Sequence, residues 1–285
     1  SYGGGRFCHN KGEASLAYDE SANLAIYFGG CSSGYGNNLW VYDCSNDVWT
    51  QVHPDIFSYM KDKKGHKWRY RKDPKSHPPG CCYTSMCYDS DMKVNLFYRG
   101  NKGATAWAPN HVYQRPANNN AWIYDAHKKK WIFTERNGKV PDVYVTGVRW
   151  AYDPIKKESV LAGSGVLWAY KTAENTWRKI TPKGPDAKPG NASSWVYMSR
   201  EKKFLLFKAL KKTSTTNSTT WFYDHATETW EDVTPKTGPA KRQSAAMAYD
   251  SLNNVAIMLS GWEAKPSKKL NDGTWVFDPA KKTWT

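Results

Sequence analysis

The fold is decided by the stretch Trp40-Val-Tyr-Asp-Cys-Ser-Asn-Asp-Val-Trp49. Its alternating aromatic and aliphatic residues predict a β-strand, the Asp with the polar residues after it predicts a tight turn, and the second Trp begins another strand. The same pattern recurs four more times, with its two tryptophans nine residues apart each time. These copies are Trp122 with Trp131, Trp168 with Trp177, Trp221 with Trp230, and Trp275 with Trp284. Ten of the 15 tryptophans belong to this repeat, so it does not arise by chance.

Two further strands precede each copy. In the first repeat, one ends in Ala17-Tyr-Asp19 and the other in Phe28-Gly-Gly30. The later pairs are Cys87-Tyr-Asp89 with Arg99-Gly100, Ala151-Tyr-Asp153 with Ala162-Gly163, Val196-Tyr197 with Phe207-Lys208, and Ala248-Tyr-Asp250 with Ser260-Gly261. Each repeat therefore holds four short strands, the content of one propeller blade. The sequence predicts an all-β propeller of five four-stranded blades.

The repeats also predict the domain organisation, a single propeller domain over residues 1–285. Its blades span residues 1–53, 76–136, 140–183, 188–236 and 240–285, with an insertion at 54–75. Because the last repeat stops in its fourth strand, we expect one closed ring; the alternative is that the chain is part of a longer one. Radial stacking of twisted sheets buries both faces of each blade, so we expect the repeated Trp and Tyr between blades rather than in a ligand site.

The repeat resembles the kelch repeat, whose hallmarks are a Gly doublet after the second strand, then a Tyr, and a Trp further on. Gly29-Gly30, Tyr42 and Trp49 supply these residues in the first repeat, whereas the later doublets are eroded and the fifth repeat has Phe277 for Tyr. The resemblance covers essentially the whole chain and implies the fold, as in the central domain of galactose oxidase. Kelch propellers include protein-binding adaptors, oxidases and carbohydrate-active proteins, so the resemblance implies no single function.

The chain contains 41 Lys and Arg residues but only 26 Asp and Glu residues, and the resulting net charge of +15 favours anionic partners. Acidic polysaccharides and acidic proteins fit this bias. Nucleic acid fits less well, since the lysine pairs are spread over many predicted turns rather than gathered on one strip. The alternative is that scattered lysines keep a Trp-rich protein soluble. No window approaches the roughly 18 uninterrupted apolar residues of a membrane span, so no membrane insertion is expected.

All six cysteines lie within the first 87 residues, and none matches a haem-attachment or paired zinc motif. They are Cys8, Cys31, Cys44, Cys81, Cys82 and Cys87. An even, clustered count predicts at least one disulfide within residues 1–90 and a secreted or extracellular protein, the periplasm included. The alternative is buried thiols, since Cys44 and Cys87 fall at predicted strand positions.

Two insertions in the second repeat are the strongest functional signal. Successive copies are separated by 82, 46, 53 and 54 residues, and the excess of the first interval falls at residues 51–80 and 101–120. In an up-and-down blade, both connections emerge on the same side. The candidate ligand-binding residues are basic or aromatic: His66, Trp68, Arg69 and Arg71 in the first insertion, and Trp107, His111, Tyr113 and Arg115 in the second. Arg pairs with carboxylate, sulfate or phosphate, and aromatic rings stack on extended ligands. The alternative is a solvated loop.

These residues predict an extracellular binding propeller for an acidic polysaccharide or an acidic protein surface, in a larger assembly or as part of a longer chain. The alternative function is a polysaccharide lyase for uronate-containing glycans, with His111 and Tyr113 as base and acid and Arg115 neutralising the carboxylate. Copper chemistry of the galactose oxidase type is not expected, because the chain has no Tyr-His dipeptide. No metal and no cofactor are predicted.

Overall fold

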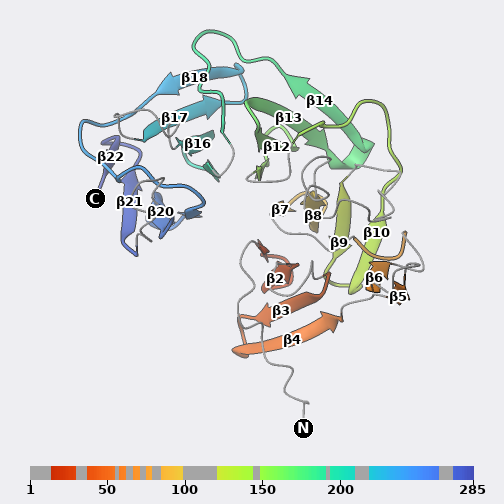
Figure 1. The fold of residues 1–285 in the computed structure, drawn as a ribbon. Coiled ribbons are helices and arrows are strands. Elements are labelled where there is room, and N and C mark those ends of the chain that lie inside the picture. Colours follow the sequence, from red (N-terminus) through yellow and green to blue (C-terminus); the bar gives the residue numbers. More distant parts are fainter. Residues whose placement is uncertain are drawn as a thin grey trace. The chain divides into compact units, whose positions relative to one another are not determined.

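The fold is an all-β propeller of five four-stranded antiparallel blades, as the repeats predict (Figure 1). The computed structural model describes residues 14–29, 37–54, 58–61, 67–70, 75–78, 85–98, 121–143, 148–190, 193–208, 218–262 and 272–285. They fall into two compact units, Ser1–Thr146 (unit 1) and Gly147–Thr285 (unit 2), which are described separately. Ring closure and the single-domain organisation stay predictions.

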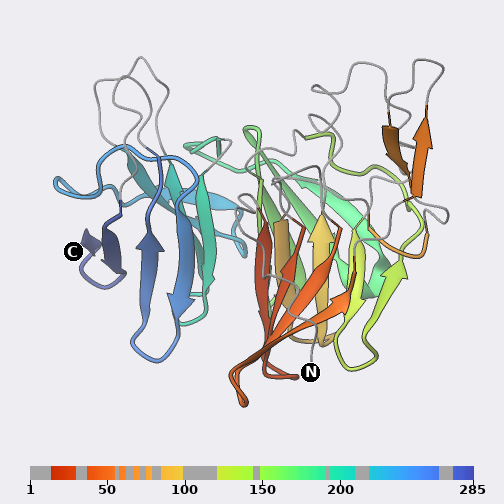
Figure 2. The same cartoon turned by 60° about the horizontal axis from the view of Figure 1, so that its bottom comes forward.

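Unit 1 contains blades 1 and 2 and a separate two-stranded sheet (Figure 2). Blade 1 consists of β1 (Ser15–Asp19), β2 (Leu24–Phe28), β3 (Leu39–Asp43) and β4 (Val48–His53). Blade 2 consists of β7 (Ser85–Asp89), β8 (Val94–Tyr98), β9 (Trp122–Asp125) and β10 (Lys130–Phe133). The first strands of the two blades, β1 and β7, contact each other.

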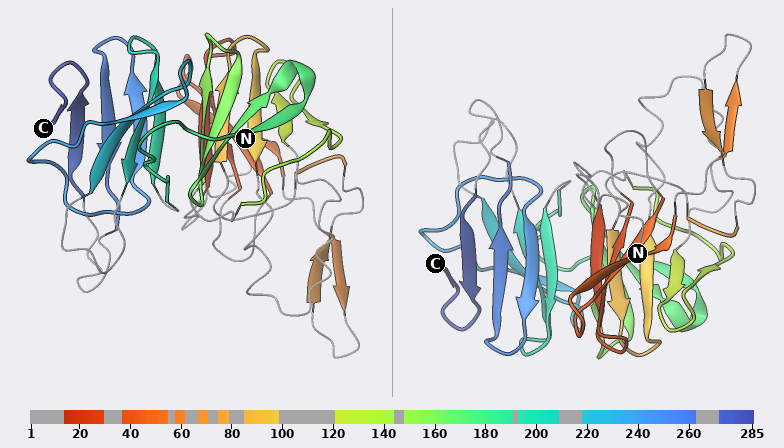
Figure 3. Two further views of the ribbon diagram at one scale, coloured as in Figure 1. Left: turned by 90° about the horizontal axis from the view of Figure 1, so that it is seen from above. Right: turned by 90° about the horizontal axis from the view of Figure 1, so that it is seen from below.

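Unit 2 contains blades 3, 4 and 5 (Figure 3). Blade 3 consists of β11 (Arg149–Asp153), β12 (Glu158–Gly163), β13 (Val166–Lys171) and β14 (Thr176–Ile180), with the short 3-10 helix η1 (Thr172–Glu174) between the last two. Blade 4 consists of β15 (Ser194–Met198), β16 (Lys203–Lys208), β17 (Thr219–Asp224) and β18 (Thr229–Asp232). Blade 5 consists of β19 (Ala246–Asp250), β20 (Val255–Leu259), β21 (Thr274–Asp278) and β22 (Thr283–Trp284). The first strands are again neighbours, β11 beside β15 and β15 beside β19.

Most tight turns are closed by the Asp that ends the preceding strand. The Oδ1 of Asp43 accepts hydrogen bonds from the backbone N–H groups of Ser45 (2.8 Å) and Asn46 (3.3 Å). Asp47 then takes a left-handed conformation (φ 55°), which matches the twist of the two strands. The corresponding left-handed residues are Asn23, Lys93, Lys129, Lys157, Asn175, Lys202, Glu228, Asn254 and Lys282. The Asp of the repeat is therefore a structural residue.

Aromatic residues of the repeat fill the space between neighbouring blades. In unit 1, Phe28 of blade 1 packs against Phe97 and Trp131 of blade 2, with ring centroids 4.6 and 5.2 Å apart. The second tryptophans of blades 2 to 5 are all buried, namely Trp131, Trp177, Trp230 and Trp284. The prediction that these rings are structural is thus confirmed for four blades. Trp49 of blade 1 is 36% exposed and contacts Tyr27 and Tyr42, with ring centroids 6.3 and 5.1 Å apart.

The two described cysteines are Cys44 and Cys87, and both carry thiols. Cys87 is buried in β7, whereas Cys44 is exposed in the turn after β3 rather than in a strand, because Asp43 already ends that strand. The other four cysteines lie outside the described residues, so the disulfide stays a prediction. Within the described part of the chain, no helix is long and apolar enough to cross a membrane.

The Gly that ends the second strand is required by close packing in blade 3. A Cβ atom on Gly163 would lie 2.7 Å from Cγ1 and 3.0 Å from Cα of the fully buried Val148. We expect Gly163→Ala to lower the free energy of unfolding by about 1–3 kcal/mol, measured by urea denaturation. Gly190→Ala is the matched control, because its Cβ would meet only Ser193 Oγ at 3.7 Å. Equal stability losses in the two variants would contradict this packing argument.

Candidate binding site beside blade 2

Both insertions of the second repeat are attached at one edge of blade 2, which we call the loop edge. The first insertion connects the end of β4 to the start of β7, and the second connects the end of β8 to the start of β9. Ser85, which begins β7, is the register partner of Tyr98, which ends β8. The two insertions therefore meet blade 2 side by side. The tight turns closed by Asp lie at the opposite ends of the strands, which we call the turn edge.

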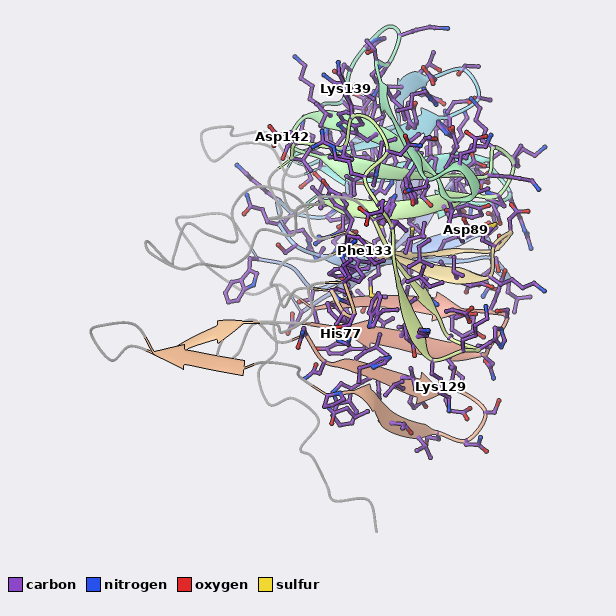
Figure 4. The ribbon with its side chains drawn as sticks, turned by 90° about the vertical axis from the view of Figure 1, so that its right-hand side faces the viewer. His77, Asp89, Lys129, Phe133, Lys139 and Asp142 are labelled. Atoms are coloured by element: carbon purple, nitrogen blue, oxygen red, sulfur yellow. The ribbon has the colours of Figure 1, made fainter. Side chains whose placement is uncertain are left out.

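The first insertion contains a β-hairpin, drawn at the left of Figure 4. It consists of β5 (Ser58–Lys61) and β6 (Lys67–Tyr70), which pair antiparallel as a two-stranded sheet. The register partners are Ser58 with Tyr70, Tyr59 with Arg69, Met60 with Trp68, and Lys61 with Lys67.

This register places most of the basic residues and most of the aromatic residues of the hairpin on opposite faces. Directly opposed residues share a face of a β-sheet, and successive residues alternate between faces. One face, the cationic face, thus contains Tyr59, Lys61, Lys67 and Arg69. The other face, the aromatic face, contains Ser58, Met60, Trp68 and Tyr70. The sequence presents its basic and aromatic residues as interleaved, and the hairpin separates them onto opposite faces.

The end of the first insertion is anchored to the loop edge of unit 1. Lys75 Nζ lies 2.7 Å from Glu135 Oε1 and 5.3 Å from the centre of the Phe133 ring. His77, which is 1% exposed, donates from Nε2 to the carbonyl of Asn37 at 2.7 Å. Figure 4 shows His77 and Phe133 beside the roots of the insertions. Lys75 and Ser76 are exposed, whereas His77 and Pro78 are buried, so the second half of this segment belongs to the interior of unit 1.

Two histidines meet at this anchor, and neither is placed to bind an anion. The rings of His53 and His77 lie 5.1 Å apart in an edge-to-face arrangement. His53 Nε2 lies 3.1 Å from the carbonyl oxygen of Lys129, to which it donates. Burial lowers the pKa of His53, and this hydrogen bond opposes the shift only in part. Burial therefore favours the neutral form of the His53 ring.

A Ser, a His and an Asp also meet at the turn edge, but their hydrogen bonds do not make a nucleophile. Ser21 Oγ donates to Asp19 Oδ1 at 2.7 Å and lies 3.0 Å from His127 Nε2. A hydroxyl has one hydrogen to donate, so His127 must donate to Ser21 rather than accept its proton. A serine nucleophile needs the opposite arrangement, with the His as base. Asn95 also donates to Asp19, at 2.7 Å, so this cluster joins blade 1 to blade 2.

A charged cluster of unit 2 is structural in the same way. Glu158 of blade 3 accepts from His225 of blade 4 at 2.9 Å, and Arg178 contacts both Glu158 (3.2 Å) and Glu228 (2.5 Å). Burial raises the pKa of Glu158, but the hydrogen bond from His225 and the charge of Arg178 outweigh it and lower the pKa overall. These contacts connect blade 3 to blade 4. No sequence pattern indicated this cluster.

Two of the eight predicted site residues lie in the described part of the hairpin. Trp68 and Arg69 lie on β6, on the aromatic and the cationic face respectively. His66, Arg71, Trp107, His111, Tyr113 and Arg115 lie outside the described residues, so their roles stay predictions. The register places Tyr59, Lys61 and Lys67 on the same face as Arg69, and none of these three is among the candidate residues chosen from the sequence. Among the described residues, no group of three or more His, Cys, Asp or Glu side chains could hold a metal ion.

No protein-family model matches the chain, and a search of curated proteins finds no match.

Proposed function

We propose that this protein is an extracellular binding propeller that recognises an extended anionic partner beside blade 2. The partner is an acidic polysaccharide or an acidic protein surface. The observation that carries the proposal is the register of the β5–β6 hairpin, which puts Lys61, Lys67 and Arg69 on one face.

Spacing and charge both support this binding mode. Residues two apart on a strand are separated by roughly 7 Å, and neighbouring strands by about 4.8 Å, so the backbone positions of the three basic residues lie close together. Neither strand of the hairpin contains an Asp or Glu that would neutralise them. Arg forms paired hydrogen bonds with carboxylate, sulfate or phosphate, and Lys supplies a further point charge.

Lysines at the turn edge are less suited to this role, because several of them already pair with carboxylates. Lys128 contacts Asp125 at 2.7 Å, Lys281 contacts Asp278 at 2.9 Å, and Lys282 contacts Glu231 at 2.5 Å. A surface lysine with its own carboxylate offers little net charge to a ligand. The contrast favours the hairpin over the turn edge as the anion-binding surface.

We also propose that the blades are of the kelch type. The main support is the role of glycine after the second strand, a hallmark of that repeat. Gly29 and Gly261 have φ angles of 77° and 116°, a region that favours glycine, and Gly163 lies against Val148. The later repeats depart from the kelch pattern because they lack the complete Gly doublet after the second strand.

The lyase alternative rests on His111, Tyr113 and Arg115, and one experiment separates it from simple binding. Polyglutamate, polygalacturonate and a sulfated glycan are each titrated at low and high salt, and absorbance at 235 nm is then followed to detect an unsaturated lyase product. We expect at least one polyanion to bind, more weakly at high salt because counterions compete for the cations, with no rise in absorbance. A rise with polygalacturonate would establish the lyase instead. Absence of binding to all three polymers would refute the binding function.

A further inference from the structure

We propose that the anionic partner is an acidic polypeptide segment that adds to the hairpin as a third strand, next to β6. This inference rests on the proposed function and narrows it from any polyanion to a peptide with a defined residue pattern.

The hairpin has an open strand edge on each side. Among the described strands, β5 and β6 pair only with each other, so each has one edge whose N–H and C=O groups face no described strand. A lone two-stranded hairpin is marginally stable in water, whereas three strands form a stable sheet. The blades already have four strands each and a packed core. The hairpin is therefore the sheet that gains most from an added strand, and open edges are where such strands bind.

The β6 strand suits an acidic partner strand better than β5 does. Lys67 and Arg69 lie on the cationic face of β6, and Trp68 and Tyr70 lie on its aromatic face. The β5 strand contributes Lys61 as its single cation. A strand beside β6 therefore has two basic residues next to it on one face of the sheet and two aromatic residues on the other.

The two faces of β6 define the sequence pattern expected of the partner. Side chains on adjacent strands interact with neighbours on the same face, and opposite charges or aromatic and β-branched pairs are favourable. A peptide with Asp or Glu at every second position and Val, Ile or an aromatic residue between them matches both faces of β6 at once. An acidic glycan offers the charge but no ladder of backbone N–H and C=O groups. The combination of edge and faces thus favours a polypeptide.

The experiment compares three labelled peptides of about eight residues, the length of a long β-strand. One alternates Glu with Val, one has the same composition with its Glu residues in a block, and one is the alternating peptide N-methylated at every second residue. N-methylation removes the strand-pairing donors along one edge and keeps the charge. By fluorescence anisotropy, we expect the alternating peptide to bind at least about tenfold more tightly than either of the other two.

Reversing the charge of two hairpin residues tests the same interaction from the side of the protein. We expect the Lys67→Glu, Arg69→Glu variant to lose at least about tenfold in affinity for the alternating Glu peptide and to bind an alternating Lys-Val peptide instead. The control variant, Lys93→Glu with Lys129→Glu, makes the same charge change at the turn edge and should bind like the parent. Thermal unfolding by circular dichroism verifies that all variants keep the blade fold.

Three outcomes would contradict strand addition, and they differ in whether they also contradict the proposed anion-binding function. Equal affinity for the three peptides means binding by charge alone, which leaves the proposed function intact. Binding of polygalacturonate or a sulfated glycan but of no peptide means that the partner is a glycan. No binding to any polyanion refutes the proposed function together with this inference.

Discussion

Replacing Trp195 with alanine is expected to lower the free energy of unfolding of unit 2 by about 3–5 kcal/mol, the range for removing a large buried aromatic ring. Trp195 is 5% exposed and lies parallel to Phe204 with ring centroids 4.7 Å apart. Its Nε1 also donates to the carbonyl of Val160 at 3.2 Å, so blade 4 loses a hydrogen bond to blade 3 together with the packing. Both losses fall on the boundary between two blades.

Urea denaturation followed by near-ultraviolet circular dichroism measures this effect, with two controls. Trp195→Phe keeps an aromatic ring against Phe204 and should lose less stability than Trp195→Ala. Trp262→Ala removes a ring that is 55% exposed and should leave stability nearly unchanged. Similar unfolding midpoints for Trp195→Ala and Trp262→Ala would show that the blade boundary does not hold unit 2 together.

The sequence predicted the blades well because each strand boundary has a local chemical cause. An Asp at the end of a strand closes the next turn through its own carboxylate, as Asp43 does with Ser45 and Asn46. This interaction spans only a few residues, so it repeats wherever the same residues repeat.

The candidate site was predictable in position but not in arrangement. Insertion lengths located it beside blade 2, and residue types indicated anions. The two faces of the hairpin depend on which residue of β5 pairs with which residue of β6, and composition does not contain that register. The sequence therefore does not separate Arg69 from Trp68, which the register places on opposite faces of the hairpin. The anchor at His77 was missed for the same reason, since its partner Asn37 is 40 residues away.

Removal of the three hairpin cations is expected to produce the largest change in function. We expect the variant Lys61→Gln, Lys67→Gln, Arg69→Gln to bind polyanions about 10- to 100-fold more weakly than the parent, or about 1–3 kcal/mol, if each cation makes a charge-assisted contact. Stability should change little, because exposed charges contribute little to a propeller core. The matched control, Lys93→Asn, Lys129→Asn, Lys202→Asn, removes three charges from turns whose left-handed conformation Asn tolerates.

The decisive measurement is the dissociation constant of each bound polyanion for the parent, the hairpin variant and the turn-edge control, determined side by side at low salt. Polyglutamate and polygalacturonate serve as the probes. If the hairpin is the binding surface, its variant alone loses affinity by about 10- to 100-fold and the control binds like the parent. Equal losses in the two variants would mean that net charge alone attracts the ligand, and an unchanged hairpin variant would place the binding surface elsewhere on the protein; either result contradicts the proposed site.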